Sequence, residues 1–239
     1  MKLSIVVPCY NEEKNLSILF ERFSKVITRD DIEVIFVENG SKDNSLKILE
    51  ALIKEYKFAR IVQVEENKGY GFGILSGMKE AKGEYLGWTH ADLQTDPGDI
   101  IKAMEIMNKY EKPEKVYIKG RRRNRPFFDI IFTLGMSFFE SIFLGVRLID
   151  INAQPNIFHH SFYDSWINPP FDFSLDLFAF YKARINKLNI IRFNVYFPKR
   201  INGQSSWNNG IKSKIKFIKR TLVYSINMKR SVHNGNHSS

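Results

Sequence analysis

The feature that most restricts the fold is an alternation, through the first half of the chain, of short apolar runs with segments of helical periodicity. This order of elements is typical of an α/β protein with a parallel sheet. Strands are predicted at residues 3–7, 32–37, 60–64, 85–88 and 116–119. The predicted fold class is therefore α/β, with a mostly parallel central sheet flanked by helices.

Three helices are expected between these strands. The first covers residues 11–27, with Asn11 as its N-cap and with Glu12 and Glu13 near its positive end. The apolar residues that mark the second are Leu46, Leu49, Leu52 and Ile53. Those that mark the third are Ile74, Leu75, Met78 and Ala81, and Gly83 is expected to close it.

Four loops follow the predicted strands at their carboxyl ends. They comprise residues 8–11, 38–41, 67–71 and 90–94, and all are polar or rich in glycine. In an open parallel sheet, ligands bind beyond this edge. We therefore expect the functional site there.

The second half of the chain changes in character from Arg121 onward. One or two amphipathic helices are predicted at 126–148, a helix at 174–187, a strand at 190–197 and a basic amphipathic helix at 211–225. The expected plan has a catalytic domain at 1–207, divided into a nucleotide-binding half (1–120) and an acceptor-side half (121–207). A basic amphipathic extension at 208–228 and a disordered tail at 229–239 complete it.

The net charge of +10 indicates anionic partners, which include nucleic acid, phosphorylated ligands and anionic lipid. The single cysteine, Cys9, excludes a disulfide framework and favours a reducing compartment, so a cytoplasmic location is expected. Residues 1–7 do not resemble a secretory signal. No membrane span is expected at 127–149, because Asp129, Glu140 and Arg147 interrupt that apolar segment.

Several motifs together resemble a known family. Residues 4–13 (SIVVPCYNEE), 37–45 (VENGSKDNS), 67–71 (NKGYG) and 91–94 (ADLQ) resemble, in order and spacing, the motifs of family 2 glycosyltransferases, which have the GT-A fold. Residues 150–155 (DINAQP) and 200–205 (RINGQS) are similar to later motifs of the dolichol- or polyprenol-phosphate sugar transferases. The resemblance covers about residues 3–207 and implies a Rossmann-like GT-A sheet, and the amphipathic helices predicted from the residue pattern follow toward the C-terminus.

A metal site is predicted at Asp92 and Gln94. These residues alternate in a short loop, so both side-chain oxygens can face one Mg²⁺ or Mn²⁺ ion. The alternative is that Asp92 only turns the chain or caps the next helix. His90 stands where the family's D-x-D motif begins, and it is expected either to bind the metal, favouring Mn²⁺, or to hydrogen-bond the ribose or phosphate.

A nucleotide site is predicted on the loops after the first two strands. Glu38 and Asn39 stand where the family commonly shows two aspartates, and the resemblance implies that Glu38 accepts the ring N–H of uracil or guanine; its alternative is a solvated turn residue. Glycines 69, 71 and 73 are expected to contact the nucleotide sugar or to pack a helix, since the full dinucleotide spacing is absent. The predicted nucleotide-binding residues are Pro8, Tyr10, Asn11, Glu12, Glu38, Asn39, Lys68, Gly69 and Ala91.

Phosphate chemistry is expected from a cluster of arginines at 121–125 and from Arg200, because guanidinium groups match phosphate oxygens. A hydroxyl acceptor requires a base, for which Asp172 and Asp176 are candidates, although Asp172 can instead cap a helix. A phosphate acceptor is already anionic and requires none. The predicted catalytic residues are Asp92, Arg121, Asp176 and Arg200.

The resulting hypothesis is an inverting transferase that moves a sugar from a UDP- or GDP-sugar to a polyprenyl phosphate or related lipid-linked acceptor. It is expected to lie peripherally on the inner face of the cytoplasmic membrane. A second copy of the chain, in a homo-oligomer, is a further candidate partner. The alternatives are transfer to a saccharide hydroxyl in surface-polysaccharide or lipopolysaccharide synthesis, and a non-catalytic binder of nucleotide sugars. A nucleic-acid partner is not expected, because no nucleic-acid-binding motif accompanies the basic clusters.

Overall fold

The computed structural model describes residues 1–202 and 218–229 and divides the chain into two compact units. The first unit consists of Met1–Arg125 and Asn152–Asn202 and contains all the described strands. The second contains Pro126–Ile151 and the helix at residues 218–229. The predicted domain end at residue 207, residues 208–217 of the extension and residues 230–239 of the tail lie outside the described residues.

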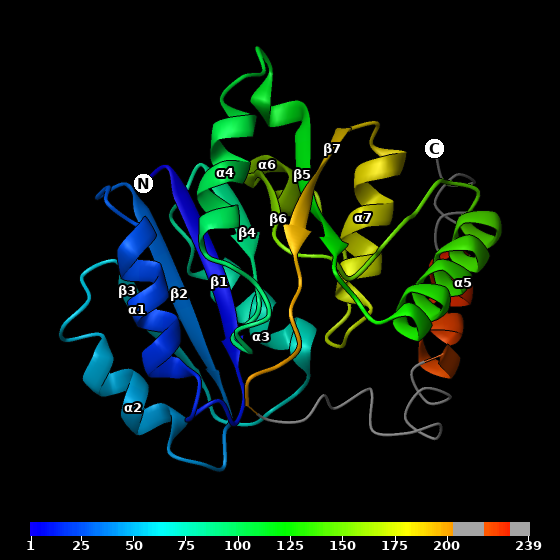
Figure 1. Ribbon diagram of the computed structural model, residues 1–239. Coiled ribbons are helices and arrows are strands. Elements are labelled where there is room, and N and C mark those ends of the chain that lie inside the picture. Colours follow the sequence, from blue (N-terminus) through cyan, green and yellow to red (C-terminus); the bar gives the residue numbers. More distant parts are fainter. Residues whose placement is uncertain (203–217, 230–239) are drawn as a thin grey trace. The chain divides into compact units, whose positions relative to one another are not determined.

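The first unit is built on a seven-stranded sheet of order β3-β2-β1-β4-β6-β5-β7 (Figure 1). The strands are β1 (Leu3–Cys9), β2 (Ile32–Asn39), β3 (Ala59–Val64), β4 (Tyr85–Trp88), β5 (Val116–Arg123), β6 (Asn156–His159) and β7 (Asn189–Tyr196). β6 runs antiparallel to β4 and β5, and every other pair is parallel. The mostly parallel sheet predicted from the sequence is confirmed.

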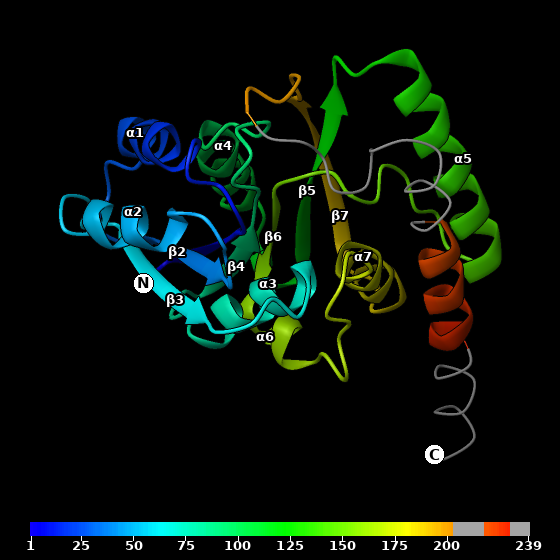
Figure 2. The ribbon, with the colours of Figure 1, turned by 90° about the horizontal axis from the view of Figure 1, so that it is seen from below.

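Helices cover both faces of this sheet, as Figure 2 shows. The face that carries α1 and α4 is opposite the face that carries α3, α6 and α7. The helices of the unit are α1 (Leu16–Val26), α2 (Ser45–Leu52), α3 (Tyr70–Lys79), α4 (Gly98–Met107), α6 (His160–Asp164) and α7 (Leu175–Ile185), with a short 3₁₀ turn at Pro113–Lys115.

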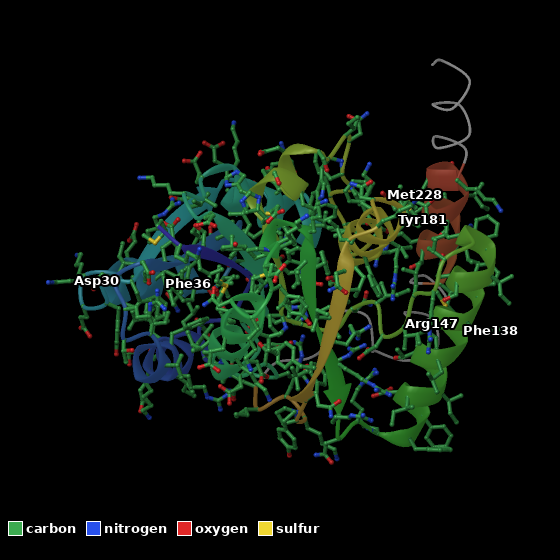
Figure 3. The ribbon with its side chains drawn as sticks, turned by 90° about the horizontal axis from the view of Figure 1, so that it is seen from above. Asp30, Phe36, Phe138, Arg147, Tyr181 and Met228 are labelled. Atoms are coloured by element: carbon green, nitrogen blue, oxygen red, sulfur yellow. The ribbon has the colours of Figure 1, made fainter. Side chains whose placement is uncertain are left out.

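The core on the α1 side is aromatic. Phe20 of α1 stacks on Phe36 of β2 with ring centroids 4.1 Å apart, and Phe23 meets the same ring edge-on at 5.9 Å. All three side chains are at most 1% exposed, and Figure 3 labels Phe36 within this layer. Burial of one such side chain contributes about 1.5–3 kcal/mol, so this contact fixes α1 against the sheet.

The first helix begins later than its predicted N-cap. Asn11 has a left-handed backbone (φ 56°), and its Oδ1 accepts from the Lys42 amide instead of from a helix amide. α1 starts at Leu16, so Glu12 and Glu13 precede it and the predicted capping role is wrong. The physical reason is that residues 11–13 satisfy the polar groups of the neighbouring β2–α2 loop.

Other boundaries also differ from expectation. α3 ends at Lys79, so Ala81 and Gly83 lie beyond it. Gly83 is required for a different reason, since a Cβ there would lie 2.5 Å from the Ser4 amide nitrogen. The expected boundary between residues 120 and 121 falls inside β5, which continues to Arg123 beside β7. β6, α4 and α6 occupy segments for which no element was predicted.

The second unit contains one long helix, α5 (Phe127–Leu144), which ends at Gly145 in a left-handed conformation. In the part of the chain that the structure describes, α5 is the one helix that is long and apolar enough to cross a membrane by length and composition. Asp129 and Glu140 lie within this helix and Arg147 lies beyond it, so the expectation that no span occurs at 127–149 stays a prediction.

Candidate active site

The loops after β1 and β2 are joined by hydrogen bonds at the carboxyl edge of the sheet. The Asn11 amide donates to Ser41 Oγ at 3.1 Å, and the Glu12 amide donates to Ser45 Oγ at 2.8 Å. Tyr10, which lies between Pro8 and Asn11 in the sequence, is 40% exposed, so its ring is accessible. The structure thus brings the two predicted nucleoside-binding loops together.

Glu38 is a buried residue that stabilises its own turn. Its side chain is directed back into the loop, where Oε1 accepts from the Ser41 amide at 2.6 Å and Oε2 from the Gly40 amide at 3.3 Å. Because the residue is only 3% exposed, the solvated-turn alternative is wrong. Each carboxylate oxygen has a second lone pair, so a base N–H can still be accepted by the same group.

Asn39 presents an open acceptor beside Glu38. Its Nδ2 donates to the Gly69 carbonyl at 3.1 Å, whereas its buried Oδ1 has no hydrogen-bond partner among the described residues. A Cβ at Gly73 would lie 3.0 Å from the Asn39 side chain, so this glycine leaves room for the amide. A buried acceptor without a partner is costly, and a ligand donor at this place would satisfy it.

The other glycines of this region serve packing. A Cβ at Gly71 would lie 2.5 Å from the Pro170 carbonyl oxygen, and one at Gly69 would collide with the Phe171 carbonyl. The Phe72 amide donates to that same Phe171 carbonyl at 2.9 Å. Lys68 lies with its Nζ 5.5 Å from the Phe72 ring centre. Of the two readings considered for these glycines, close packing fits Gly69 and Gly71.

Asp92 and Gln94 face one another across a tight turn after β4. Leu93, between them, has a left-handed backbone (φ 61°) and a buried side chain, which fixes the turn that carries its two neighbours. The Gln94 amide donates to Asp92 Oδ1 at 3.1 Å. Ala91, before the turn, is buried. The predicted pair is thus assembled, and Asp92 also serves its turn, as the alternative reading proposed.

A guanidinium group bridges this pair. Arg200 Nη2 lies 2.7 Å from Asp92 Oδ2, and Arg200 Nε donates to Gln94 Oε1 at 3.2 Å. The Gln94 Nε2 in turn donates to the Pro198 carbonyl at 2.7 Å, and Asn202 donates to Asn15 Oδ1 at 3.0 Å. The segment 198–202 therefore extends along the site, and a cationic group stands between the two predicted metal ligands.

These residues fit a divalent cation in the donor-bound state. The carboxylate and amide oxygens are the ligand types that Mg²⁺ and Mn²⁺ take, and the guanidinium shows that they stabilise positive charge here. Within residues 1–202 and 218–229, no group of three or more His, Cys, Asp or Glu side chains is placed to hold a metal. A metal at Asp92 and Gln94 would therefore need further ligands from the bound donor or water.

His90 lies close to this pair and to Tyr70, whose ring centre is 5.7 Å from its own. Burial lowers the pKa of His90, the charges of Asp92 and Asp176 oppose this, and Arg200 and Arg122 lower it further. The imidazole is therefore neutral at neutral pH, the form that can bind a metal or accept a hydrogen bond. Both predicted roles remain predictions.

Glu12 also belongs to this group of charges. Burial raises its pKa, a hydrogen bond from Asn15 lowers it, and the charge of Asp92 raises it again. Arg200 acts in the opposite direction on the same carboxyl group. Glu12 therefore lies on the metal side of the nucleoside loops and is held in place through Asn15.

Asp176 anchors a buried polar network beneath the edge. It is 1% exposed, and its Oδ1 accepts from Gln154 Nε2 at 2.9 Å, Trp88 Nε1 at 3.2 Å and Asn156 Nδ2 at 3.3 Å. Asn156 Oδ1 accepts from Lys119 Nζ at 2.7 Å. Because β6 is antiparallel, its first residue arrives at the carboxyl edge and joins these groups. This geometry supports a positioning role for Asp176, and its role as a base remains a prediction.

Three members of this network were missed from the sequence: Lys119, Gln154 and Asn156. The available signal was a lysine inside the apolar run of β5, where an unpaired charge is not tolerated. Asp172, the other candidate base, accepts from the Ser174 amide at 2.8 Å and so forms the turn before α7. The N-cap of α7 is Ser174, two residues later, so the helix-cap alternative for Asp172 is wrong.

The arginine cluster is divided by the alternation of β5. Adjacent residues of a strand point to opposite faces, so Arg121 and Arg122 diverge. Arg122 lies 5.2 Å from the Phe197 ring, and its charge contributes to the low pKa of His90. Arg123 donates to Asn194 at 2.9 Å, and Arg121 is exposed. Arg122 is therefore nearer to the site than Arg121, which the sequence favoured.

Comparison with known proteins gives one family. The sequence model described as Glycosyl transferase family 2 matches residues 4–168. Among curated relatives, the undecaprenyl-phosphate 4-deoxy-4-formamido-L-arabinose transferase of Yersinia enterocolitica is 37% identical over 110 residues, covering 44% of this chain and 33% of that protein. The dolichol-phosphate mannosyltransferase of Pyrococcus furiosus is 29% identical over 138 residues, covering 56% of this chain and 39% of that protein.

The fold has solved counterparts. Glucosyl-3-phosphoglycerate synthase from Mycobacterium tuberculosis, in complex with Mn²⁺, UDP and phosphoglyceric acid, matches with a TM-score of 0.72 at 15% identity. That match covers 94% of this chain and 77% of the other, and it shows the GT-A fold. This chain spans between a third and a half of the length of the curated relatives that it matches first.

Proposed function

Because this chain belongs to glycosyl transferase family 2, we propose that it transfers a sugar from a UDP- or GDP-sugar to a polyprenyl phosphate, with inversion at the sugar carbon. The observation that carries the proposal is the buried Asp92 carboxylate, which lies beside Gln94 and forms an ion pair with Arg200. This group lies at the same edge of the sheet as the nucleoside loops. Curated relatives named for transfer to undecaprenyl or dolichol phosphate support the choice of acceptor.

In this proposal the nucleoside lies against the β1 and β2 loops. Glu38 accepts a base N–H, and the unpaired Asn39 Oδ1 accepts a donor from the ligand. Asp92 and Gln94, with His90 adjacent, hold a Mg²⁺ or Mn²⁺ ion, which when bound neutralises charge on the diphosphate leaving group. Arg200 leaves Asp92 and, with Arg122, binds phosphate oxygens.

A phosphate acceptor agrees with the surroundings of Asp176. The three donors on its Oδ1 hold this carboxylate as part of the site floor. A phosphate monoester has a second pKa of about 6, so it is already largely anionic at neutral pH and needs no base. Transfer to a saccharide hydroxyl is the second candidate, and it would require Asp176 or Asp172 to accept a proton.

We further propose that the protein works at the inner face of the cytoplasmic membrane, where nucleotide sugars and lipid-linked acceptors meet. The supporting observations are the net charge of +10, the single unpaired Cys9 and the relatives named for lipid-phosphate acceptors.

The test is transfer from labelled UDP- and GDP-sugars, with Mn²⁺, to polyprenyl phosphate and, separately, to the free polyprenol. We expect product with the phosphate only, and a loss of at least about a hundredfold in Asp92→Asn, as for removal of a group that stabilises transition-state charge. Asp96→Asn, an exposed position in the same segment, is the control and should retain activity. Equal activity in Asp92→Asn would refute the site, and product from the free polyprenol would refute the phosphate acceptor.

A further inference from the structure

The outward surface of α5 is apolar along its whole length. Each exposed residue of this helix is either apolar or glycine. The large members are Phe127, Phe128, Ile130, Ile131, Leu134, Phe138, Phe139 and Ile142. Phe128 is 79% exposed and Phe138 69%, and Figure 3 labels Phe138 on α5. An exposed apolar surface of this extent marks an interaction site.

The inward surface of the same helix carries polar groups beside the buried Leu144. Glu140 is fully buried, and its Oε2 accepts from Ser225 Oγ of helix 218–229 at 2.6 Å. Ser137 is also buried, and its Oγ accepts from the Asp150 amide at 3.1 Å. Lys229 Nζ donates to the Phe143 carbonyl at 2.9 Å, so it joins the ends of the two helices. Polar groups therefore hold this helix pair together.

This arrangement differs from that of a helix pair in water, where the largest apolar side chains face the partner and polar residues face the solvent. A lipid environment favours the observed order, because it solvates the phenylalanine and isoleucine side chains and strengthens hydrogen bonds between helices. A protein partner of ordinary composition would instead be expected to leave a rim of polar residues around the apolar patch. None of the exposed positions of α5 is polar.

Basic residues lie on both sides of the apolar helix in the sequence. Arg125 precedes α5 and Arg147 follows it, while Lys219 and Lys229 are exposed on helix 218–229. Such cations are attracted to the anionic headgroups of a charged bilayer surface. The positive charge of Arg147, Lys219 and Lys229 in this unit therefore complements one kind of apolar environment, an anionic membrane.

We propose that α5 and helix 218–229 form a membrane-binding helix pair, with α5 lying in the plane of an anionic bilayer and its phenylalanine face among the acyl chains. The in-plane orientation follows from the two-sided character of α5, apolar outward and hydrogen-bonded inward. The partner is the lipid surface itself. The inference rests on the second unit alone and does not require the proposed sugar transfer.

The first experiment is sedimentation of the full chain with vesicles of phosphatidylglycerol and phosphatidylcholine, or of phosphatidylcholine alone. We expect binding to the anionic vesicles, and a loss of about tenfold or more in partitioning for Phe128→Ser, given the transfer free energy of a phenylalanine side chain. The matched control is Ile167→Ser in the first unit, because Ile167 is 76% exposed and apolar as well. It should bind as the wild type does.

A second experiment places a probe on the proposed face. Phe138→Trp should give a blue-shifted emission component with anionic vesicles, and lipids brominated on their acyl chains should quench it. No binding of the wild-type chain to anionic vesicles would overturn the proposal, as would equal partitioning of Phe128→Ser and Ile167→Ser. A lipid-independent dimer that Phe128→Ser dissociates, without any vesicle binding, would assign the face to a second copy instead.

Discussion

At the residue scale, the most informative contact is the one between Arg200 and Asp92. The carboxylate is buried, and its described partners are the Gln94 amide and the Arg200 guanidinium. Removing one member of such a pair leaves a charge with little solvation, which is strongly unfavourable. A guanidinium and a divalent cation cannot occupy the same place, so the metal site proposed at Asp92 would couple donor binding to a movement of Arg200.

This coupling predicts an unusual result for Arg200→Ala. Its affinity for Mn²⁺ alone should rise by about tenfold, corresponding to an ion pair worth about 1.4 kcal/mol, because the metal no longer competes with the guanidinium. Its affinity for UDP or GDP in the presence of Mn²⁺ should fall, because a phosphate ligand is lost. Titration calorimetry measures both. Lys199→Ala is the control, and unchanged Mn²⁺ affinity in Arg200→Ala would contradict the coupling.

At the element scale, the position of α3 depends on glycines that admit another part of the chain. The carbonyls of Pro170 and Asp172 lie where a Cβ of Gly71 would be, at 2.5 and 2.7 Å. The segment before α7 is thereby fixed against the first turn of α3. A side chain at this position would separate two elements that line the same edge of the sheet.

Gly71→Ala should therefore destabilise the protein by about 1–3 kcal/mol, the usual result of overpacking. Gly135→Ala is the control, since no heavy atom lies within 4 Å of its Cβ position in α5. That change should be stabilising by roughly 0.5–1 kcal/mol, because alanine favours a helix interior. Urea unfolding of both variants measures the difference. Equal stability of the two would mean that the segment moves aside without cost.

The first turn of α4 predicts a pH effect. Burial, and then the charge of Asp96, raise the pKa of Asp99 from 3.8 to about 6. A raised pKa means that the stabilising contribution is complete below the unfolded-state pKa and is lost as pH rises through about 6. Asp99→Asn should therefore be more stable than the wild type at neutral pH, by at most about 3 kcal/mol. The interaction of the carboxylate with the helix N-terminus, about 0.5 kcal/mol, offsets part of this.

Unfolding by urea across the range from about pH 3 to pH 7 checks this prediction. The difference between the two proteins should disappear toward the acidic end, where Asp99 is protonated in both states. A difference that does not change with pH would show that Asp99 titrates normally.

The elements that could be predicted are those whose local pattern and final environment agree. Strands β1, β2 and β4 are mostly apolar and buried on both faces, so their composition identifies them. β6 has four residues and follows a segment without periodicity, so only its pairing with β4 and β5 defines it. The start of α1 was missed because its first expected turn bonds to the β2–α2 loop, a contact between residues 30 positions apart.

The site was predictable where residues are close in sequence and not where the fold brings them together. Asp92 and Gln94 could be paired from their spacing, whereas the pairing of Gln94 with Arg200 spans 106 positions. The choice of Arg121 over Arg122 depended on which face of β5 points to His90, and the run of arginines does not contain that information. Lys119, Gln154 and Asn156 form a network that requires the antiparallel strand β6.

At the scale of the whole molecule, two units with opposite surface chemistry share one chain. In the first unit the apolar residues are inside and the charged residues are outside, as in a protein folded in water. In the second, the helix pair is held by polar contacts and exposes phenylalanine. Residues 126–151 of the second unit are inserted between β5 and β6. The chain therefore connects α5 directly to both of these strands, which contribute to the site floor.

The position of β6 also determines the order in which the sheet can form. During synthesis, strands β1 to β4 can assemble as soon as they emerge, but β5 cannot join them, because β6 lies between β4 and β5 in the finished sheet. Until residues 156–159 arrive, β4 has an unpaired edge that another chain could occupy. We therefore expect folding and aggregation to compete at the insertion of this short strand from late in the sequence.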